Sequence, residues 1–184
     1  MYYSTTYPSP VGLLTLACDD DNLAGLWIEG QKYHGATIPA AMTEKDKMPV
    51  FTKTKSWLDK YFAGKKPEIA QLPLAPIGSD FRREVWDILC EIPYGKVITY
   101  GDVAQKIAVN RNAKNTYNRA VGGAVGHNPI SIIIPCHRVI GSSGNLTGYA
   151  GGIAIKIKLL ELEGVDMSQM RVPNVTGASA NLSD

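Results

Sequence analysis

A proline-rich segment divides this chain of 184 residues into two parts with different patterns. Residues 65–78 contain Pro67, Pro73 and Pro76 and show neither helical nor strand periodicity. Proline fixes φ and removes a backbone donor, so neither a helix nor a central strand runs easily through such a segment. We therefore predict a domain of residues 1–76 that includes this linker, a second domain of residues 77–167, and a mobile tail of residues 168–184.

The first domain is predicted to be a small antiparallel sheet with one helix. Residues 3–7, 13–17 and 23–28 read as strands, and turn-forming residues separate the three runs. A meander is the simplest arrangement of these strands. Residues 49–62 then place apolar side chains at helical spacing, and Gly64 supplies a helix stop.

Local capping signals predict that the second domain is mostly helical. Ser79 can cap a helix that runs to about Ile92, because its hydroxyl can accept from an N–H of the first turn. The sequence Thr-Tyr-Gly-Asp at residues 99–102 has the spacing of a capping box and opens a helix through Ala108. A last helix is predicted over residues 153–163.

Residues 117–125 predict a helix with few side chains, including Ala120, Gly122 and Gly123. Glycine costs up to about 1 kcal/mol in a helix interior, so something should approach this backbone closely. Either an external ligand or another helix of the protein could do so. A polar loop over residues 109–116 joins this helix to the preceding one, which resembles a helix-turn-helix with a connector longer than usual.

Residues 131–134 (Ser-Ile-Ile-Ile) have the composition of a buried strand and lead directly to Cys136. The predicted fold class is therefore α+β. It combines a small N-terminal antiparallel sheet with a helix and a mostly helical C-terminal domain, which holds a helix-turn-helix and a short strand leading to Cys136.

The formal net charge of +2 hides an uneven distribution. Residues 95–160 hold eight basic side chains and the single acid Asp102. A local excess of +7 (eight minus one) is a candidate footprint for a polyanion, although basic residues also simply solvate a surface. The eight are Lys96, Lys106, Arg111, Lys114, Arg119, Arg138, Lys156 and Lys158.

Composition excludes several classes of protein. Hydrophobic residues make up 45% and charged residues 20%, which is typical of a globular chain and not of a disordered one. No apolar run approaches the ~20 residues of a membrane helix, and the first residues lack the pattern of a secretory signal. Three widely spaced cysteines without a Cys-x-x-Cys pair argue against a disulfide framework, and they favour a reducing compartment such as the cytoplasm or nucleoid.

Cys136 is the strongest candidate for a reactive group. The thiolate is the nucleophilic form, so a reactive cysteine needs a base or an electropositive setting. His137 is the adjacent base, and Arg138 follows it. The alternative is that Cys136 is a small buried hydrophobe, which is the commoner fate of a lone cysteine.

The last predicted helix carries two charged residues on its apolar side. At about 100° per residue, Lys156 and Glu163 project in nearly the same direction. Charges in such a position should have partners. Glu163 could accept a hydrogen bond from His137, or Lys156 and Glu163 could pair only with each other.

Residues 135–139 (Pro-Cys-His-Arg-Val), after an Asn-Pro pair and an isoleucine run, resemble the active-site signature of the O6-alkylguanine-DNA alkyltransferases, also called methylated-DNA–protein-cysteine methyltransferases. The resemblance covers residues 81–164, and the N-terminal meander with its Ser-Pro-Val-Gly turn is also similar. The further matching motifs are Tyr94-Gly95-Lys96-Val97, Thr99-Tyr100, Arg119-Ala120-Val121-Gly122-Gly123-Ala124, Asn128-Pro129 and Tyr149-Ala150-Gly151-Gly152.

This resemblance implies a single-turnover mechanism without a cofactor or a metal. Cys136 would take the alkyl group from a guanine rotated out of the duplex, with O4-alkylthymine as a further substrate. His137 would remove the thiol proton through water, and Glu163 would orient His137. Asn128 would brace the active-site turn, and Tyr100 would donate a hydrogen bond to the departing guanine.

The resemblance also implies a monomer that binds double-stranded DNA through the minor groove. Arg119 would enter the base stack where the flipped base had been, on a helix whose small residues lie against the DNA. The implied DNA-binding residues are Arg119, Ala120, Gly122, Gly123, Thr99 and Arg138. The implied substrate pocket consists of Tyr149, Ala150, Gly151 and Lys156.

The chain departs from the family pattern at three places. Ala150 stands where many members carry serine, the connector of residues 109–118 is long, and Cys18 and His34 have no companions that would complete a zinc site. Three alternatives remain: a lesion reader that does not repair, a helix-turn-helix regulator, and a cysteine hydrolase. The reader class lacks the cysteine, the regulator leaves Cys136, His137 and Glu163 unexplained, and the hydrolase needs no basic groove.

Overall fold

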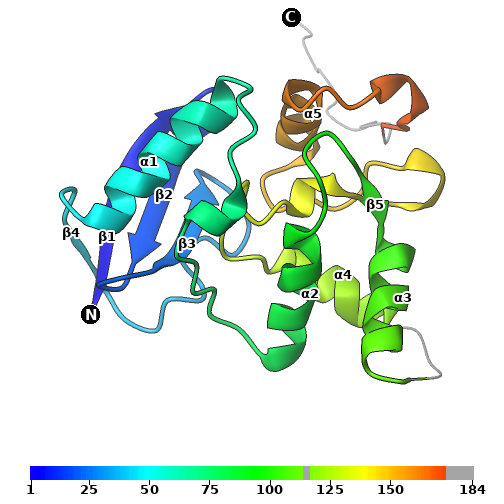
Figure 1. Ribbon diagram of the computed structural model, residues 1–184, viewed down its shortest axis with the longest axis horizontal. Helices are drawn as coiled ribbons and strands as arrows, with labels where there is room; N and C mark the ends of the chain where they lie inside the picture. Colours follow the sequence, from blue (N-terminus) through cyan, green and yellow to red (C-terminus); the bar gives the residue numbers. More distant parts are fainter. Residues whose placement is uncertain (114–116, 173–184) are drawn as a thin grey trace, which may run out of the picture.

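The computed structural model describes residues 1–113 and 117–172, and it shows an α+β fold with a sheet-containing part and a mostly helical part side by side (Figure 1). The first part contains β1 (Tyr2–Ser9), β2 (Gly12–Cys18), β3 (Leu23–Ile28), β4 (Met42–Glu44) and α1 (Pro49–Phe62). The second contains α2 (Asp80–Cys90), β5 (Ile98–Thr99), α3 (Tyr100–Asn110), α4 (Asn118–Gly126), β6 (Val139–Ile140) and α5 (Ile153–Leu162). Short 3₁₀ helices lie at Ile69–Gln71, Cys136–Arg138, Ser142–Gly144 and Met167–Gln169.

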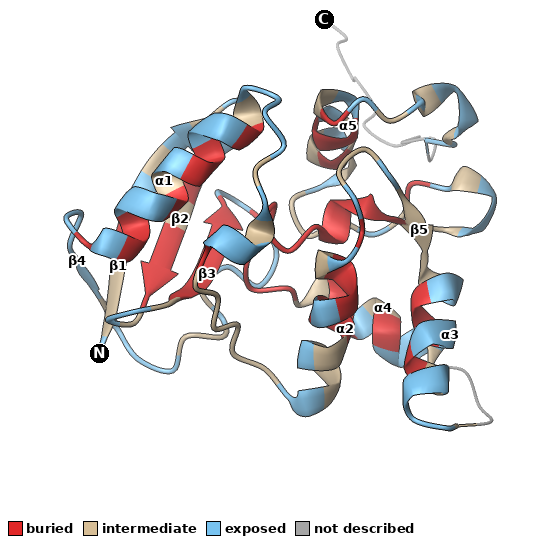
Figure 2. Ribbon diagram, viewed as in Figure 1, coloured by how far each residue is buried: buried red, intermediate tan, exposed pale blue. Residues whose placement is uncertain are grey.

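The N-terminal sheet has the strand order β3-β2-β1-β4. Antiparallel pairing of β1 with β2 and of β2 with β3 confirms the predicted meander. The three-residue strand β4, which pairs parallel with β1, was not predicted. Helix α1 has the predicted bounds and lies across the sheet with its buried side facing it (Figure 2).

Strand β3 joins the two parts. All six of its residues are buried, and its free edge is covered by the chain just before the cysteine. The Leu26 N–H donates to the Pro129 carbonyl at 2.9 Å, and the Ser131 N–H donates to the Leu26 carbonyl at 2.8 Å. The position of the turn that carries Cys136 therefore depends on the N-terminal sheet.

The capping predictions are confirmed. The Ser79 hydroxyl accepts from the Arg82 N–H, and Thr99 and Asp102 form a reciprocal capping box at the start of α3. Helix α3 extends two residues beyond the predicted end at Ala108. The connector therefore begins later than predicted, and its residues 114–116 lie outside the described part of the chain.

The predicted strand at residues 131–134 is wrong. These residues are buried but form a turn, in which Ile132 has φ 71°. The side chain of Asn128 provides hydrogen-bond partners for two backbone groups of this turn. Its Oδ1 accepts from the Ile130 N–H at 3.0 Å, and its Nδ2 donates to the Ile134 carbonyl at 2.8 Å. The short strand of this region is β6, which follows Cys136 and pairs parallel with β5, so no strand leads to Cys136.

The predicted mobile tail is described only at its beginning. Residues 168–172 are tied to an earlier loop, because the Leu146 N–H donates to the Arg171 carbonyl and the Arg171 N–H donates to the Gly144 carbonyl. The remaining residues, 173–184, lie outside the described residues.

The turn after α2 places a glycine against the end of α5. Gly95 has φ 75°, and a Cβ on it would lie 2.7 Å from the carbonyl oxygen of Glu163. Gly64, which follows α1, has φ 72° but no atom within 4 Å of such a Cβ. A side chain at Gly64 would therefore meet only the strain of a positive φ, whereas one at Gly95 would also meet a backbone atom.

We expect Gly95→Ala to lower the free energy of unfolding by about 2 kcal/mol or more, because positive φ and a backbone clash add together. Gly64→Ala should cost about 1 kcal/mol, from positive φ alone. Urea denaturation of both variants measures the difference. Equal losses would show that the contact between Gly95 and Glu163 is not tight.

Candidate active site

Cys136 is the first residue of the 3₁₀ helix that follows the buried turn. Its backbone N–H donates to the Ile134 carbonyl at 2.8 Å, and the Asn128 Nδ2 lies 3.1 Å from its Sγ as a donor. One asparagine side chain thus fixes both the turn and the sulfur. Only 4% of Cys136 is exposed.

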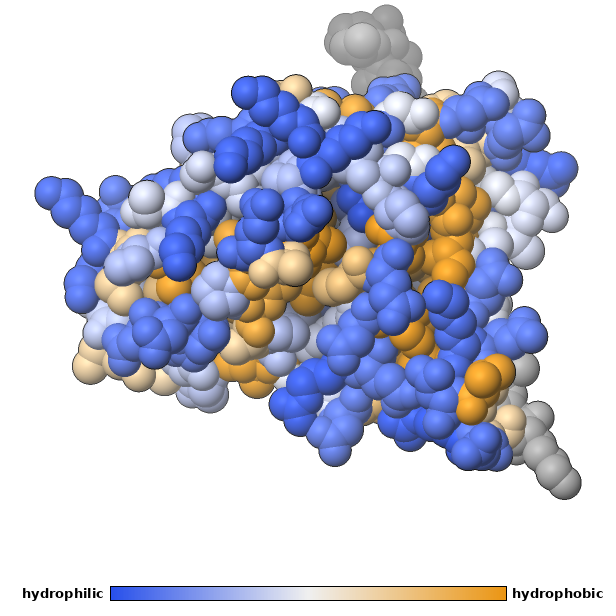
Figure 3. Space-filling view, in the orientation of Figure 1, coloured by the Kyte–Doolittle hydropathy of each residue, from blue (hydrophilic) through white to orange (hydrophobic). Residues whose placement is uncertain are grey.

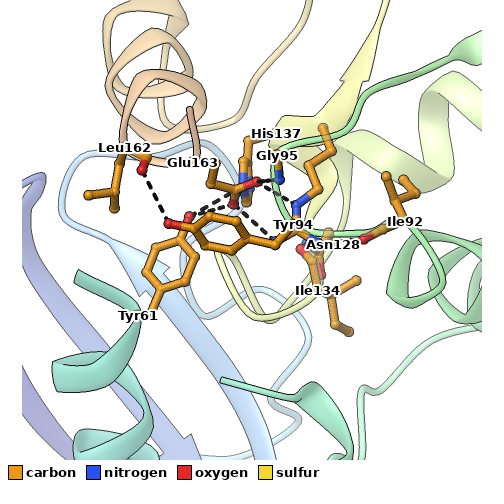
Figure 4. Close-up of polar contacts among 10 residues, drawn as sticks. Tyr61, Ile92, Tyr94, Gly95, Asn128, Ile134, His137, Leu162 and Glu163 are labelled. Atoms are coloured by element: carbon orange, nitrogen blue, oxygen red, sulfur yellow. Dashed lines mark hydrogen bonds and ion pairs between the residues drawn. The ribbon is translucent and has the colours of Figure 1, made fainter. Parts of the chain in front are cut away.

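The carboxylate of Glu163, at the end of α5, lies at the centre of a buried hydrogen-bond network (Figure 4). Its Oε1 accepts from Tyr61 Oη at 2.7 Å, Arg138 Nη2 at 3.0 Å and His137 Nε2 at 2.6 Å. Its Oε2 accepts from Arg138 Nε at 2.8 Å and the Gly95 N–H at 3.1 Å. Burial alone would raise the pKa of Glu163, but the hydrogen bonds and charges of His137 and Arg138 outweigh burial and lower that pKa to about 2.

This carboxylate determines which nitrogen of His137 carries the proton. An ionised carboxylate only accepts hydrogen bonds, so the Nε2 atom of His137 must be the donor. The lone pair then lies on Nδ1, which is buried and has no hydrogen-bond partner among the described residues. Burial lowers the pKa of His137, which favours the neutral ring. The imidazole is therefore arranged to accept a proton at Nδ1.

The thiol itself lies in a buried but partly electropositive setting. Burial raises the pKa of Cys136, while the Asn128 hydrogen bond, the charge of Lys156 and the backbone N–H groups of Cys136 and His137 oppose that rise. Burial thus favours the protonated thiol over the thiolate. Cys18 and Cys90 are also free thiols, and burial raises the pKa of each to about 11.

Lys156 does not pair with Glu163, contrary to one of the two alternatives. Its Nζ donates to the carbonyls of Val139 at 2.6 Å and Thr147 at 3.0 Å, and its side chain is fully buried. Burial lowers the pKa of Lys156 to about 8. The prediction that Lys156 lines the substrate pocket is wrong, because its buried side chain is absent from the lining of the pocket described below and donates to backbone carbonyls instead.

A pocket of about 420 Å³ opens between α3, α4 and the loop that precedes α5. Burial, followed by the charge of Cys136, raises the pKa of Tyr100 to about 12, and raises that of Tyr149 well above its usual range. The pocket is lined by Lys32, Tyr33, Tyr100, Asn118, Gly122, Gly126, Thr147, Gly148, Tyr149 and Ala150.

The lining contains predicted and unpredicted residues. Tyr149 and Ala150, which were predicted for the substrate pocket, line this one, and so does Tyr100, which was predicted to donate to guanine. Gly151 is absent from the lining, and a Cβ on it would lie 3.0 Å from the ring of Tyr149. Lys32 and Tyr33 come from the N-terminal part, and no local signal in the sequence singles them out. Tyr33 stacks on the ring of His127 with centroids 4.0 Å apart.

Some of the small residues of α4 face outward, whereas Ala124 is buried. Arg119, Ala120 and Gly123 are exposed, and a Cβ on Gly122 or Gly123 would meet no atom within 4 Å. Packing against another helix of the protein therefore does not require these glycines. Of the two alternatives for this segment, close approach of an external ligand is favoured.

The surface charge of residues 95–160 is smaller than the sequence suggests. Arg138 is 5% exposed and donates to Glu163 and to the Ile92 carbonyl, so its assignment as a DNA-binding residue is wrong. Lys156 is buried as well. Lys106 and Arg111 form ion pairs with Glu91 and Glu84, and Lys114 lies outside the described residues.

The Thr99 hydroxyl, which was predicted to contact DNA, is hydrogen-bonded to Asp102 in the capping box of α3.

No group of three or more His, Cys, Asp or Glu residues within 1–113 and 117–172 is placed to hold a metal ion. No helix in the same ranges is long and apolar enough to cross a membrane. Hydrophilic residues cover most of the face seen in Figure 3, with apolar residues visible between them.

Fold and site together define an α+β protein with a buried cysteine, an adjacent histidine that is paired with a buried glutamate, and an open pocket. A family model described as "6-O-methylguanine DNA methyltransferase, ribonuclease-like domain" matches residues 1–76, and one described as "6-O-methylguanine DNA methyltransferase, DNA binding domain" matches residues 80–165. Together they cover most of the chain. The chain belongs to the methylated-DNA–protein-cysteine methyltransferase family.

Individual relatives agree with this membership. The methylated-DNA–protein-cysteine methyltransferase of Haemophilus influenzae is 44% identical over 88% of this chain and 86% of its own. The one from Methanosarcina barkeri is 47% identical over 89% of this chain and 97% of its own. A crystal structure of Mycobacterium tuberculosis OGT in complex with DNA has a TM-score of 0.76 and 41% identity, and covers 92% of this chain and 94% of that chain.

We expect Glu163→Gln to lower the free energy of unfolding at pH 7 by about 3 kcal/mol, because Arg138 would lose its buried counter-charge. The pKa of Glu163 is about 2 in the folded protein and about 4.3 in an unfolded chain. The stabilisation is therefore complete above the unfolded value and is lost as the pH falls toward 2.

Urea denaturation between pH 7 and pH 2 tests this expectation, with Glu161→Gln on the exposed side of α5 as the control. The deficit of Glu163→Gln should shrink below pH 4.3, and Glu161→Gln should show almost none. A deficit that is constant with pH would argue against an ionised Glu163.

Proposed function

We propose that this protein transfers an alkyl group from O6-alkylguanine in DNA to its own Cys136, once per molecule. Membership of the methylated-DNA–protein-cysteine methyltransferase family supports DNA repair by alkyl transfer as its activity. The assignment of Cys136 rests on one observation, the hydrogen bond that holds its neighbour His137 to Glu163. Of the three cysteines, this one lies beside a histidine whose Nδ1 lone pair is free among the described residues.

The reaction begins with removal of the thiol proton. A water molecule between Cys136 Sγ and His137 Nδ1 would pass that proton to the imidazole. The ionised Glu163 would stabilise the resulting imidazolium through Nε2. Asn128 would hold the sulfur in place and donate to the thiolate as it forms.

Alkyl transfer is then an in-line displacement. The new bond joins Sγ to the alkyl carbon, and the bond between that carbon and O6 of guanine breaks. Tyr100, whose hydroxyl donates to the Gly148 carbonyl at 3.1 Å, would instead donate to the guanine as negative charge develops on it. In net terms the thiol proton replaces the alkyl group on guanine.

The thioether product is chemically stable, so each molecule reacts once. No cofactor enters this scheme. Ala150 contributes no side-chain hydroxyl to the pocket, so any donor from this position to guanine O6 would be its backbone N–H. The proposal includes O4-alkylthymine as a second substrate of the same reaction.

DNA would lie against α4. The exposed Arg119 would fill the gap left by the flipped base, and the open surface over Gly122 and Gly123 would lie along the minor groove. Ala120 is exposed on the same helix, and Thr99 lies at the N-terminus of the neighbouring α3. The structural similarity to Mycobacterium tuberculosis OGT in complex with DNA supports DNA as the partner.

The proposal also covers the location of the protein, its oligomeric state and its domain boundaries. We place the protein in the cytoplasm, or at the nucleoid if it is bacterial or archaeal, as a monomer. The three free cysteines support a reducing compartment. The proposed domains remain residues 1–76 and 77–167, followed by the tail of residues 168–184.

The lesion-reader and regulator alternatives have less support. Neither uses the arrangement of Cys136, His137 and Glu163. A hydrolase would use the cysteine and the histidine, but it gives no role to the outward-facing glycines of α4.

Incubation with a duplex that contains one O6-methylguanine should add the mass of one methyl group to the protein, on Cys136. Intact-mass spectrometry and peptide mapping measure the site and the stoichiometry. Cys90→Ser is the matched control and should react like the unaltered protein. A label on another residue, or more than one guanine repaired per protein, would refute the proposal.

Arg119→Ala should slow repair of duplex DNA at least about tenfold, since binding and flipping lose the side chain that replaces the base. Reaction with a free alkylated guanine base should change less than about twofold, because no stack has to be filled. Arg83→Ala, which alters an exposed pair with Asp80 on α2, is the control. Equal losses on both substrates would mean that Arg119 does not act in the base stack.

A further inference from the structure

One member of the Glu163 network comes from outside the helical part. Tyr61 belongs to α1, in the N-terminal part, and lies 102 residues from Glu163 in the sequence. Its ring is 1% exposed, and its hydroxyl donates to Glu163 Oε1 at 2.7 Å (Figure 4). The mechanism above does not use this side chain.

The ring of Tyr61 is held firmly by its neighbours. It stacks on Trp57 with centroids 5.4 Å apart and an interplanar angle of 9°, and it meets Phe62 and Tyr94 edge-on. The indole N–H of Trp57 in turn donates to the Glu68 carbonyl at 3.0 Å. The hydroxyl is thus presented to Glu163 by a rigid aromatic cluster.

The hydrogen-bond geometry determines where the Tyr61 hydroxyl donates and where it accepts. Its single proton goes to the carboxylate, since Glu163 is ionised and Oε1 can only accept. The Tyr61 oxygen also lies 3.4 Å from His137 Nε2, so one of its lone pairs faces the proton on that nitrogen. Both contacts favour a proton on Nε2 and a lone pair on Nδ1. Burial and the Glu163 charge raise the pKa of Tyr61, so it remains a donor.

We infer that Tyr61 is a positioning residue for alkyl transfer, supplied by the N-terminal domain. It fixes Glu163 Oε1 and thereby keeps His137 oriented toward the thiol. This inference rests on the proposed function, because it assigns Tyr61 a role in that same reaction. The competing explanation is that Tyr61 only holds the two parts of the fold together.

The first test compares Tyr61→Phe with Tyr94→Phe. Both keep their rings and lose one hydroxyl, but the Tyr94 hydroxyl donates to the Leu162 carbonyl and not to Glu163. At saturating methylated duplex, Tyr61→Phe should lower the first-order transfer rate constant about tenfold, as expected for a hydrogen bond to a charged group. Its Kd for duplex, and both constants of Tyr94→Phe, should stay within about twofold of the original protein.

The second test asks whether Tyr61 acts through the base. In a His137→Asn background the base is gone, so Tyr61→Phe should change the residual transfer rate less than about twofold. A tenfold loss in that background, or no loss in the original one, would overturn the inference. Thermal unfolding of every variant confirms that it is folded.

A measurement on the unaltered protein covers the case in which Tyr61→Phe does not fold. Nitrogen-15 NMR of labelled histidine should show His137 protonated at Nε2 and unprotonated at Nδ1. The opposite tautomer would overturn the inference. If the unaltered protein gains no methyl mass, the proposed function fails, whereas methyl gain at equal rates with and without the Tyr61 hydroxyl refutes only the role of Tyr61.

Discussion

The buried carboxylate of Glu163 is the interaction on which the rest of the site depends. A carboxylate out of water is unfavourable unless its oxygens are satisfied, and here donors from four residues satisfy them. The donors come from α1, from the turn after α2 and from the 3₁₀ helix that contains the cysteine. One charge thus holds together three segments that are far apart in the sequence, and it also determines the protonated nitrogen of His137.

Local signals in the sequence predicted the local structure well. Ser79, the capping box at Thr99 and the helix of residues 49–62 depend on neighbours within a few residues, so the sequence alone sufficed. The strand predicted for residues 131–134 is wrong because the isoleucine-rich composition indicates burial but does not determine the backbone conformation. A turn satisfied by the Asn128 side chain buries the same residues as a strand would.

Long-range contacts explain the remaining errors and omissions. The sequence predicts that Arg138 binds DNA and that Lys156 lines the substrate pocket, but each donates to buried acceptors that no local pattern identifies. Tyr61, Lys32 and Tyr33 reach the site from the N-terminal part, and nothing near them in the sequence marks them. Cys136, His137 and Glu163 could be chosen in advance because the motif and the helical spacing are local, although the Glu163–His137 contact itself is not.

A high-resolution crystal structure of the unreacted protein tests the central claim most directly. The claim is that His137, held through Nε2 by Glu163, accepts the Cys136 proton at Nδ1. We predict one ordered water molecule within hydrogen-bond distance of both His137 Nδ1 and Cys136 Sγ. A structure in which Nδ1 is bonded to a protein group, or in which no water connects it to the sulfur, would contradict the account.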